Sequence, residues 1–373
     1  MRTHMTAIDD TSAEYSEELE QEEQEVLSQD DSSEQPPTDI VAFNELRSCA
    51  DLVRMYKSNQ LTIKPEFQRD VVWSTAAQTR FIDSLTKQLP IPSMCISLDY
   101  NTNKRLVIDG LQRMWSIIMF LTNDDWKLSN LRDIDDRLAG KKVSYIREHN
   151  PAIHDAIENW TIPVTVLRCD YKKKNHMEYL FTIFHRLNTG GNKLTNQEIR
   201  NCIYSGDLNA LLGRCVQNNE FRDLFDLKKD ETYRFAYEEF VLRFFAFSDR
   251  YKQYDGNLSR FLNTYMTTNR NPLDDDTLSA MESHFDETTH LIFEKVCDGK
   301  QLPKLSKATY EALFVGVGEN MEALRTKPAK ELCDKFKAMR QAEEFSLISL
   351  KNAITTKAKL IARLDKAIEI FSK

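Results

Sequence analysis

The spacing of hydrophobic positions divides the chain into a mixed first part and a helical second part. Before residue 170, helical spacing alternates with the short apolar runs typical of strands. The pattern predicts helices at 43–56, 75–89 and 112–121, and extended segments at 61–67, 94–98, 105–108 and 162–167. After residue 170 only helical periodicity remains, over 180–187, 206–266 and 275–373, with 343–371 expected as one long helix. The expected fold class is α+β, a small mixed domain followed by an all-helical one.

Local signals mark several helix ends. Thr75 to Gln78 and Thr195 to Glu198 each have the spacing of a capping box, which starts a helix. Prolines at 90 and 92 end the helix that follows Thr75. The motifs below can therefore be assigned to junctions between elements.

Residues 1–39 differ from the rest of the chain. They hold 13 acidic residues and one basic residue, Arg2, for a net charge of −12, and almost no bulky apolar side chains. Such a segment cannot bury enough surface to order itself, so we expect a disordered acidic tail. The whole chain has a net charge of −8, so the remaining 334 residues, with 49 basic and 45 acidic side chains, carry +4. The predicted domains are 1–39, 40–170 and 171–373.

Several protein classes are excluded. No apolar run approaches the ~20 residues that a membrane span needs, and the acidic start is unlike a secretory signal. The seven cysteines form no CxxC pair, which fits a cytoplasmic protein without a disulfide framework. No histidines have a metal-binding spacing, and His149 and His154 are expected on the surface.

The first candidate site is the motif DGLQR at 109–113, where a predicted strand meets a predicted helix. Such a junction presents free N–H groups and the positive end of a helix dipole, which together bind anions. Gly110 allows close approach of a ligand, Arg113 offers a bidentate phosphate contact, and Asp109 suits a metal ion or a water molecule. The alternative is an ordinary corner in which Asp109 caps the helix and Arg113 is a solvated surface residue.

The second candidate lies at 67–73, where Gln68 and Arg69 stand between Phe67 and Trp73. The two polar residues could reach a phosphate or a base while an aromatic ring packs beneath them. In the alternative, Trp73 belongs to the core and Arg69 pairs with Asp70.

The third candidate lies at 186–191 and contains Asn188, Thr189 and Gly190. These residues are typical of a helix C-terminus and the turn after it. Their backbone N–H groups and the Asn188 side chain could also contact a nucleotide.

Taken in order, these segments resemble a known family. The order is Phe67 to Trp73, the prolines at 90 and 92, the motif at 109–113, and 187–198. It resembles the DGQQR-motif domain of GmrSD-type modification-dependent restriction systems and related phage-defence proteins, a family similar to the ParB/sulfiredoxin fold. The resemblance covers roughly 40–205. The family motif has Gln where this chain has Leu111, so a polar contact is missing here.

The resemblance implies nucleotide binding and, in active members, NTP hydrolysis that controls a nuclease. Asp109, Gln112 and Arg113 carry over as the catalytic motif residues. The implied nucleotide-binding residues are Gln68, Arg69, Gly110, Asn188, Thr189 and Gly190. Arg69 and Arg113 would neutralise the triphosphate, and Asp109 would hold Mg²⁺ or position water.

Two activities of related proteins are not expected. Many family members carry a C-terminal HNH-type nuclease, but His284 and His290, the only histidines after residue 200, are expected on a helix surface. A nuclease activity would therefore come from a partner protein. Sulfiredoxin-like chemistry needs a cysteine in the motif, and Cys95 is expected as a small core residue.

The leading hypothesis is an NTP-binding, NTP-hydrolysing sensor or regulator in restriction or phage–host biology. One alternative is a non-enzymatic DNA-binding or scaffold protein, for which the basic 351–373 segment would supply backbone contacts. A third is a counter-defence protein whose acidic tail imitates DNA. The nucleotide, the partner and a homo-oligomeric state are left open.

Overall fold

The structure is a computed structural model that describes residues 36–63, 73–187, 194–228, 235–269, 273–351 and 354–372. It forms two compact units, the sheet unit Glu34–Ile203 and the helical unit Tyr204–Lys373. This confirms the α+β class, with strands in the first part and helices after it. The sheet unit extends past the predicted boundary at 170, because the helix Lys174–Leu187 packs on strand Arg105–Asp109. The predicted tail lies almost entirely outside the described residues.

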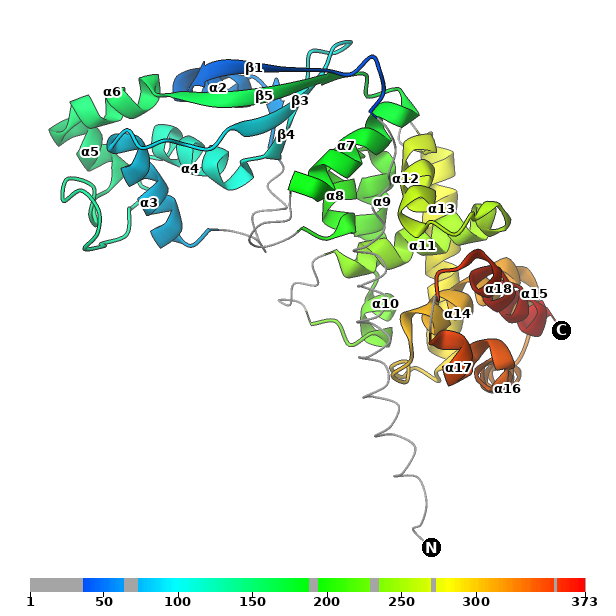
Figure 1. Cartoon of the computed structure of the whole chain (residues 1–373). Coiled ribbons are helices and arrows are strands. Elements are labelled where there is room, and N and C mark those ends of the chain that lie inside the picture. Colours follow the sequence, from blue (N-terminus) through cyan, green and yellow to red (C-terminus); the bar gives the residue numbers. More distant parts are fainter. Residues whose placement is uncertain are drawn as a thin grey trace, which may run out of the picture. The chain divides into compact units, whose positions relative to one another are not determined.

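The sheet has five strands in the order β1-β5-β3-β4-β2 (Figure 1). Their bounds are β1 Val41–Ser48, β2 Leu61–Thr62, β3 Met94–Asp99, β4 Arg105–Asp109 and β5 Thr161–Cys169. β3 and β4 form an antiparallel hairpin, while β5 runs antiparallel to β1 and parallel to β3. The predicted hairpin and the strand at 162–167 are therefore confirmed.

The start of the predicted helix at 43–56 is wrong. Residues Val41–Ser48 form β1, and only Cys49–Lys57 are helical. Every residue of β1 pairs with β5, so strand pairing overrides the helical spacing of Phe43 and Leu46. Ser48 ends the strand and caps the helix, accepting a hydrogen bond from the Asp51 N–H.

Helices cover the sheet and pack on one another around one core. They are α2 Cys49–Lys57, α3 Thr75–Thr86, α4 Leu111–Thr122, α5 Val143–His149, α6 Pro151–Asn159, α7 Lys174–Leu187 and α8 Asn196–Ile203. The cap of α3 is Ser74, one residue before the predicted capping box. At α8 the predicted box is confirmed, because Thr195 and Glu198 bond each other's backbone N–H reciprocally.

Asp39 anchors the chain just before β1. Its carboxylate accepts hydrogen bonds from Lys173 and from Nε2 of the fully buried His176 (2.8 Å). Nδ1 of His176 accepts from the Asp170 N–H (2.9 Å), which fixes the proton of a neutral ring on Nε2. Lys173 first, and His176 second, lower the pKa of Asp39 from 3.8 to about 2.

This anchor predicts a pH dependence. Because the folded pKa is depressed, the stabilisation by Asp39 is fully present above pH 3.8 and is lost as the pH falls through about 2. We expect Asp39→Asn to lower the unfolding midpoint at pH 5, and the difference from wild type to shrink between pH 4 and pH 2. Chemical unfolding at a series of pH values measures this. A difference that stays constant with pH would contradict it.

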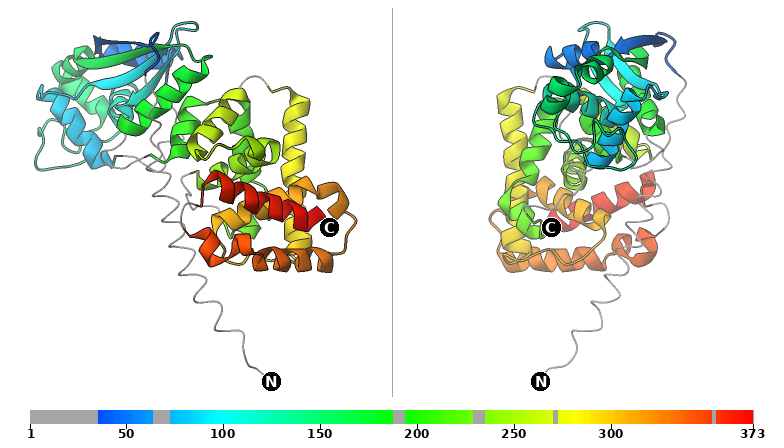
Figure 2. Two further views of the ribbon diagram at one scale, coloured as in Figure 1. Left: turned by 45° about the vertical axis from the view of Figure 1, so that its right-hand side comes forward. Right: turned by 90° about the vertical axis from the view of Figure 1, so that its left-hand side faces the viewer.

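The helical unit contains no strand among its described residues (Figure 2). Its α-helices are α9 Asp207–Val216, α10 Asn219–Leu224, α11 Ala236–Arg250, α12 Leu258–Thr268, α13 Asp275–His290, α14 Lys307–Glu319, α15 Met321–Leu324, α16 Ala329–Gln341, α17 Leu347–Leu350 and α18 Lys357–Ser372. Its other helical segments are the 3₁₀ turns η2 Tyr251–Gln253 and η4 Glu343–Phe345 and the π-helical η3 Leu291–Val296. An aromatic cluster fills its centre: Phe221, Phe225, Phe240, Phe244, Phe285 and Phe314. None of the described helices of the chain is both long and apolar enough for a membrane span.

The predicted single helix at 343–371 is wrong, because the segment holds η4, α17 and α18. Ser346 adopts an extended conformation and its side chain accepts the Ser349 N–H, which starts a new helix. Leu350 and Ile354 then pack with Ala308 of α14. Capping and packing therefore break a segment whose periodicity alone is continuous.

A buried ionic network links α11 to α14. The guanidinium of Arg243, 1% exposed, donates to Glu239 and to Glu311, each over 2.6 Å. Lys307 lies 3.5 Å from the same Glu239 oxygen. Removing one member would leave charge in a region from which water is excluded.

Candidate functional site

The junction between β4 and α4 is built as a helix start without a side-chain cap. Asp109 is the last residue of β4, and Gly110 is the N-cap of α4 in the left-handed conformation (φ 94°). A Cβ at Gly110 would lie 2.6 Å from Cγ of Met94, so the position requires glycine for conformation and for space. Gly110 therefore supplies no side-chain cap to the first N–H groups of α4 in the described part of the chain.

Arg113 is held by internal partners. Its Nη2 donates to Oδ2 of Asp109 over 2.6 Å, and its Nη1 donates to the carbonyls of Pro92 and Ser93. The Arg113 side chain is 12% exposed, whereas that of Asp109 is 41% exposed. Both halves of the ordinary-corner alternative are wrong, since Asp109 does not cap α4 and Arg113 is not a solvated surface residue.

Gln112 connects the motif to the second candidate segment. Its side-chain oxygen accepts a hydrogen bond from the Trp73 N–H over 3.1 Å. The Trp73 ring meets Phe81 of α3 edge-on, with ring centroids 5.6 Å apart, and packs against the core. Trp73 is thus a structural residue, and Gln112 of the motif binds its backbone just before α3 begins.

Cys95 lies opposite Asp109 in the β3–β4 pairing, next to a register shift between Cys95 and Ile96. Burial, and to a smaller degree the Asp109 charge, raise the pKa of this thiol to about 12. The cysteine is therefore protonated at neutral pH and is a poor nucleophile. This agrees with its expected place in the core.

The junction brings together Asp109, Gly110, Gln112 and Arg113, together with loop residues that the motif alone did not reveal. The carbonyls of Pro92 and Ser93 bind Arg113, and Met94 packs beneath Gly110. The prolines at 90 and 92 were a signal for this loop. The remaining predicted site residues lie outside the described part of the chain: Gln68, Arg69, Asn188, Thr189 and Gly190.

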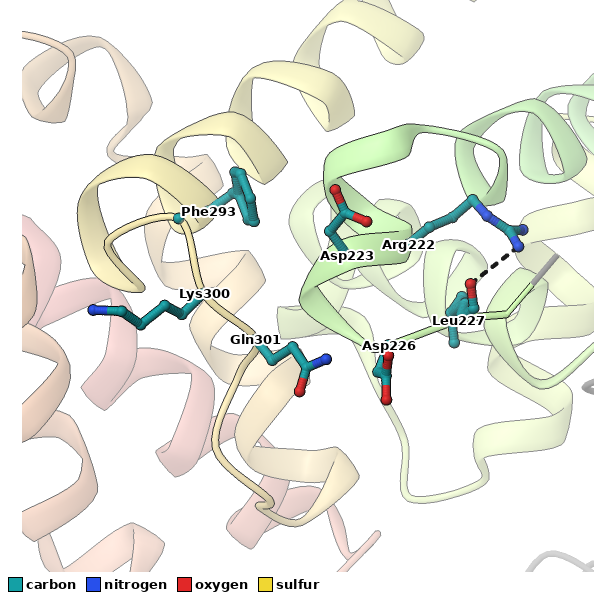
Figure 3. Close-up of a pocket in the computed structure, with 8 residues that line it drawn as sticks. Arg222, Asp223, Asp226, Leu227, Phe293, Lys300 and Gln301 are labelled. Atoms are coloured by element: carbon teal, nitrogen blue, oxygen red, sulfur yellow. Dashed lines mark hydrogen bonds between the residues drawn. The ribbon is translucent and has the colours of Figure 1, made fainter.

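A cavity of about 580 Å³ opens in the helical unit (Figure 3). Its lining includes Arg222, Asp223 and Asp226 from one side, and Phe293 and Lys300 from the other. Arg222 is turned to the Leu227 carbonyl, 3.1 Å away. Among the described residues, none of the predicted site residues lines this cavity.

The two histidines of α13 differ in their surroundings. His290 is exposed and lies 2.9 Å from Glu220. His284 is partly buried and stacks on Phe244, and burial lowers its pKa. The surface prediction is therefore correct for His290 but wrong for His284, which is partly buried against Phe244.

Comparison with known proteins identifies one domain. Residues 49–205 match the family described as the GmrSD restriction endonuclease, N-terminal domain. Searches of curated proteins and of solved structures found no match, so the expected likeness to the ParB/sulfiredoxin fold stays a prediction.

Proposed function

We propose that this protein is a nucleotide-binding, NTP-hydrolysing regulator. The match of residues 49–205 to the GmrSD N-terminal domain supports a role in restriction and phage defence. The nucleotide site of the protein is the junction of β4 and α4. The nuclease that the protein controls is a partner protein.

The observation that carries this proposal is the glycine N-cap of α4, which offers no capping side chain of its own. Gly110 offers no side chain to the first N–H groups of a 12-residue helix, and the helix dipole favours negative charge there. The same glycine permits a phosphate to approach the backbone. A phosphate oxygen would take the place that a Ser or Asp side chain takes at the start of other helices.

Asp109 suits the Mg²⁺ ion that accompanies a nucleoside triphosphate. Its carboxylate is 41% exposed, and Oδ2 is occupied by Arg113. In the described parts of the chain, Oδ1 has no hydrogen-bond partner. Mg²⁺ commonly binds one or two carboxylates together with water and phosphate oxygens, so one available Asp oxygen fits this ion. Mg²⁺ would neutralise charge on the phosphates, while the chain holds the triphosphate at α4.

Arg113 then acts as a positioning residue. It connects Asp109 to the carbonyls at 92–93, which keeps the carboxylate beside the helix start. We therefore propose that Arg113 acts on the phosphates through Asp109 and not by direct contact, because two of its guanidinium nitrogens already donate to other groups. Leu111 replaces a polar family residue one position before Gln112, so we propose slow turnover.

A thermal-shift screen of the four ribonucleoside triphosphates tests the proposal. With Mg²⁺, we expect at least one nucleotide at millimolar concentration to raise the unfolding midpoint of the full chain. Ligand at 100 times its Kd stabilises the folded state by about 2.7 kcal/mol. Asp109→Asn should lose the part of the shift that depends on Mg²⁺.

Arg80→Ala is the matched control, because Arg80 forms an exposed pair with Asp133 on the same unit. This variant should keep the full shift. If no nucleotide moves the midpoint of the wild-type chain, the proposal is wrong. Salt-dependent DNA binding without NTP turnover would instead support the scaffold alternative.

A further inference from the structure

Three potential metal ligands lie together on α6. One ligand atom from each of His154, Asp155 and Glu158 lies within 4.8 Å of the other two. His154 and Glu158 are four residues apart, so one helical turn brings them to the same face. The group belongs to the sheet unit and shares no residue with the β4–α4 junction.

His154 is not the surface residue that the sequence suggested. Its side chain is 9% exposed, and its ring stacks on Phe120 with centroids 5.6 Å apart and planes at 28°. Its Nε2 is buried and has no hydrogen-bond partner among the described residues. By contrast, Nδ1 of the exposed His149 meets the Tyr145 carbonyl at 3.1 Å. Stacking therefore holds the His154 ring in place, and its buried polar atom lacks the partner that such atoms normally have.

The two carboxylates beside His154 lack a cationic partner. Across the described residues, neither Asp155 nor Glu158 forms an ion pair, although most acidic side chains of α2, α3 and α5 and their neighbouring loops do. Among the described residues, Asn159 donates its side-chain amide to the Asp155 backbone carbonyl, and none forms a hydrogen bond with the Asp155 carboxylate. Two negative charges next to a fixed imidazole favour a bound cation.

We propose that His154, Asp155 and Glu158 bind a first-row divalent transition metal ion, with Zn²⁺ as the best fit. Imidazole together with carboxylates suits Zn²⁺, whereas Mg²⁺ and Ca²⁺ prefer all-oxygen sites. Ligand atoms about 2.1 Å from a tetrahedral Zn²⁺ lie about 3.4 Å apart. The three atoms lie at most 4.8 Å apart, so side-chain rotations must bring them closer by up to about 1.4 Å. Water would complete a four-coordinate shell.

Calorimetric titration of Zn²⁺ into the full chain tests this site, with 5 mM Mg²⁺ present. We expect one ion to bind, and Glu158→Gln and Asp155→Asn each to weaken that binding at least tenfold. Asp155 is exposed and Glu158 is partly exposed, so these variants should fold normally, which a thermal melt without metal verifies. His149→Gln is the matched control, since it removes an exposed imidazole from the neighbouring helix.

Two results of the Zn²⁺ titration would overturn the proposal. Zn²⁺ binding that is equal in Glu158→Gln and wild type would overturn the proposal and point to the free cysteines of the chain. Co²⁺ spectra separate the two cases, because thiolate ligands give a sulfur-to-metal charge-transfer band that nitrogen and oxygen ligands do not. Absence of Zn²⁺ binding in the wild type would also overturn it. Neither result depends on nucleotide binding.

Discussion

Replacing Arg113 with alanine is expected to lower NTP turnover about 10–100-fold, because a hydrogen-bonded partner of a metal-binding carboxylate has an effect of this size. Arg113 holds Asp109 through a 2.6 Å bond and ties it to the loop at 92–93. Without it, Asp109 loses its fixed orientation. The variant should therefore need more Mg²⁺ for half-maximal turnover, which steady-state kinetics over a Mg²⁺ series measures.

Arg113→Lys, measured over the same Mg²⁺ series, separates the loss of Asp109 positioning from the loss of the Arg113 charge. Arg113→Lys keeps the charge but cannot bridge Asp109 and two carbonyls in the same planar geometry, so it should recover only part of the activity. Arg80→Ala should retain wild-type kinetics, since it removes only an exposed pair between Arg80 of α3 and Asp133 of the loop after α4. Equal turnover in Arg113→Ala and wild type would remove Arg113 from the site.

The largest expected loss of stability comes from Arg243→Ala, at about 3–5 kcal/mol in the unfolding of the helical unit. The change leaves Glu239 and Glu311, which are 9% and 6% exposed, without the guanidinium between them. Their charges then stay in a region with little water, or the carboxyls take up protons on folding. Urea unfolding of the full chain, followed by far-UV circular dichroism, measures the loss.

A triple variant shows whether Arg243→Ala destabilises the unit by leaving two carboxylates unpaired or by removing the packing of the arginine side chain. Arg243→Met combined with Glu239→Gln and Glu311→Gln should recover most of the stability, because the three buried charges are removed and Lys307, whose side chain is 25% exposed, can turn its charge to water. Arg214→Ala is the control: it breaks a more exposed pair with Glu282, which contributes about 0.2–1 kcal/mol. If Arg243→Ala were as mild as Arg214→Ala, the network would have little effect on stability.

Local signals predicted much of the sheet unit. The β3–β4 hairpin, α4 after Gly110 and the capping box at Thr195 all rest on residues close in sequence. The same is true of the motif at 109–113, whose residues the fold holds at one junction. These features follow from turn chemistry and periodicity, which operate within a few residues.

The errors arose where distant residues decide the structure. Phe43 and Leu46 have helical spacing, yet pairing with β5 makes their segment a strand. The carbonyls at 92–93 that accept hydrogen bonds from Arg113 are about twenty positions away in sequence, so the motif alone does not reveal them. His154 lies in a polar stretch, and only the fold brings Phe120 against its ring. Such contacts leave no mark within a short window of sequence.

The strand order also affects how the chain acquires its structure during synthesis. β5 lies between β1 and β3, and Val41 pairs with Arg168, which is 127 positions later in the chain. On the ribosome, β1 emerges long before its only partner strand, so its apolar side chains, Phe43 among them, stay without that partner until β5 has been made. Pairing over such a separation slows folding. The nascent sheet unit therefore passes through an interval in which an unpaired strand can associate with other chains, and its yield should depend on translation rate and chaperones.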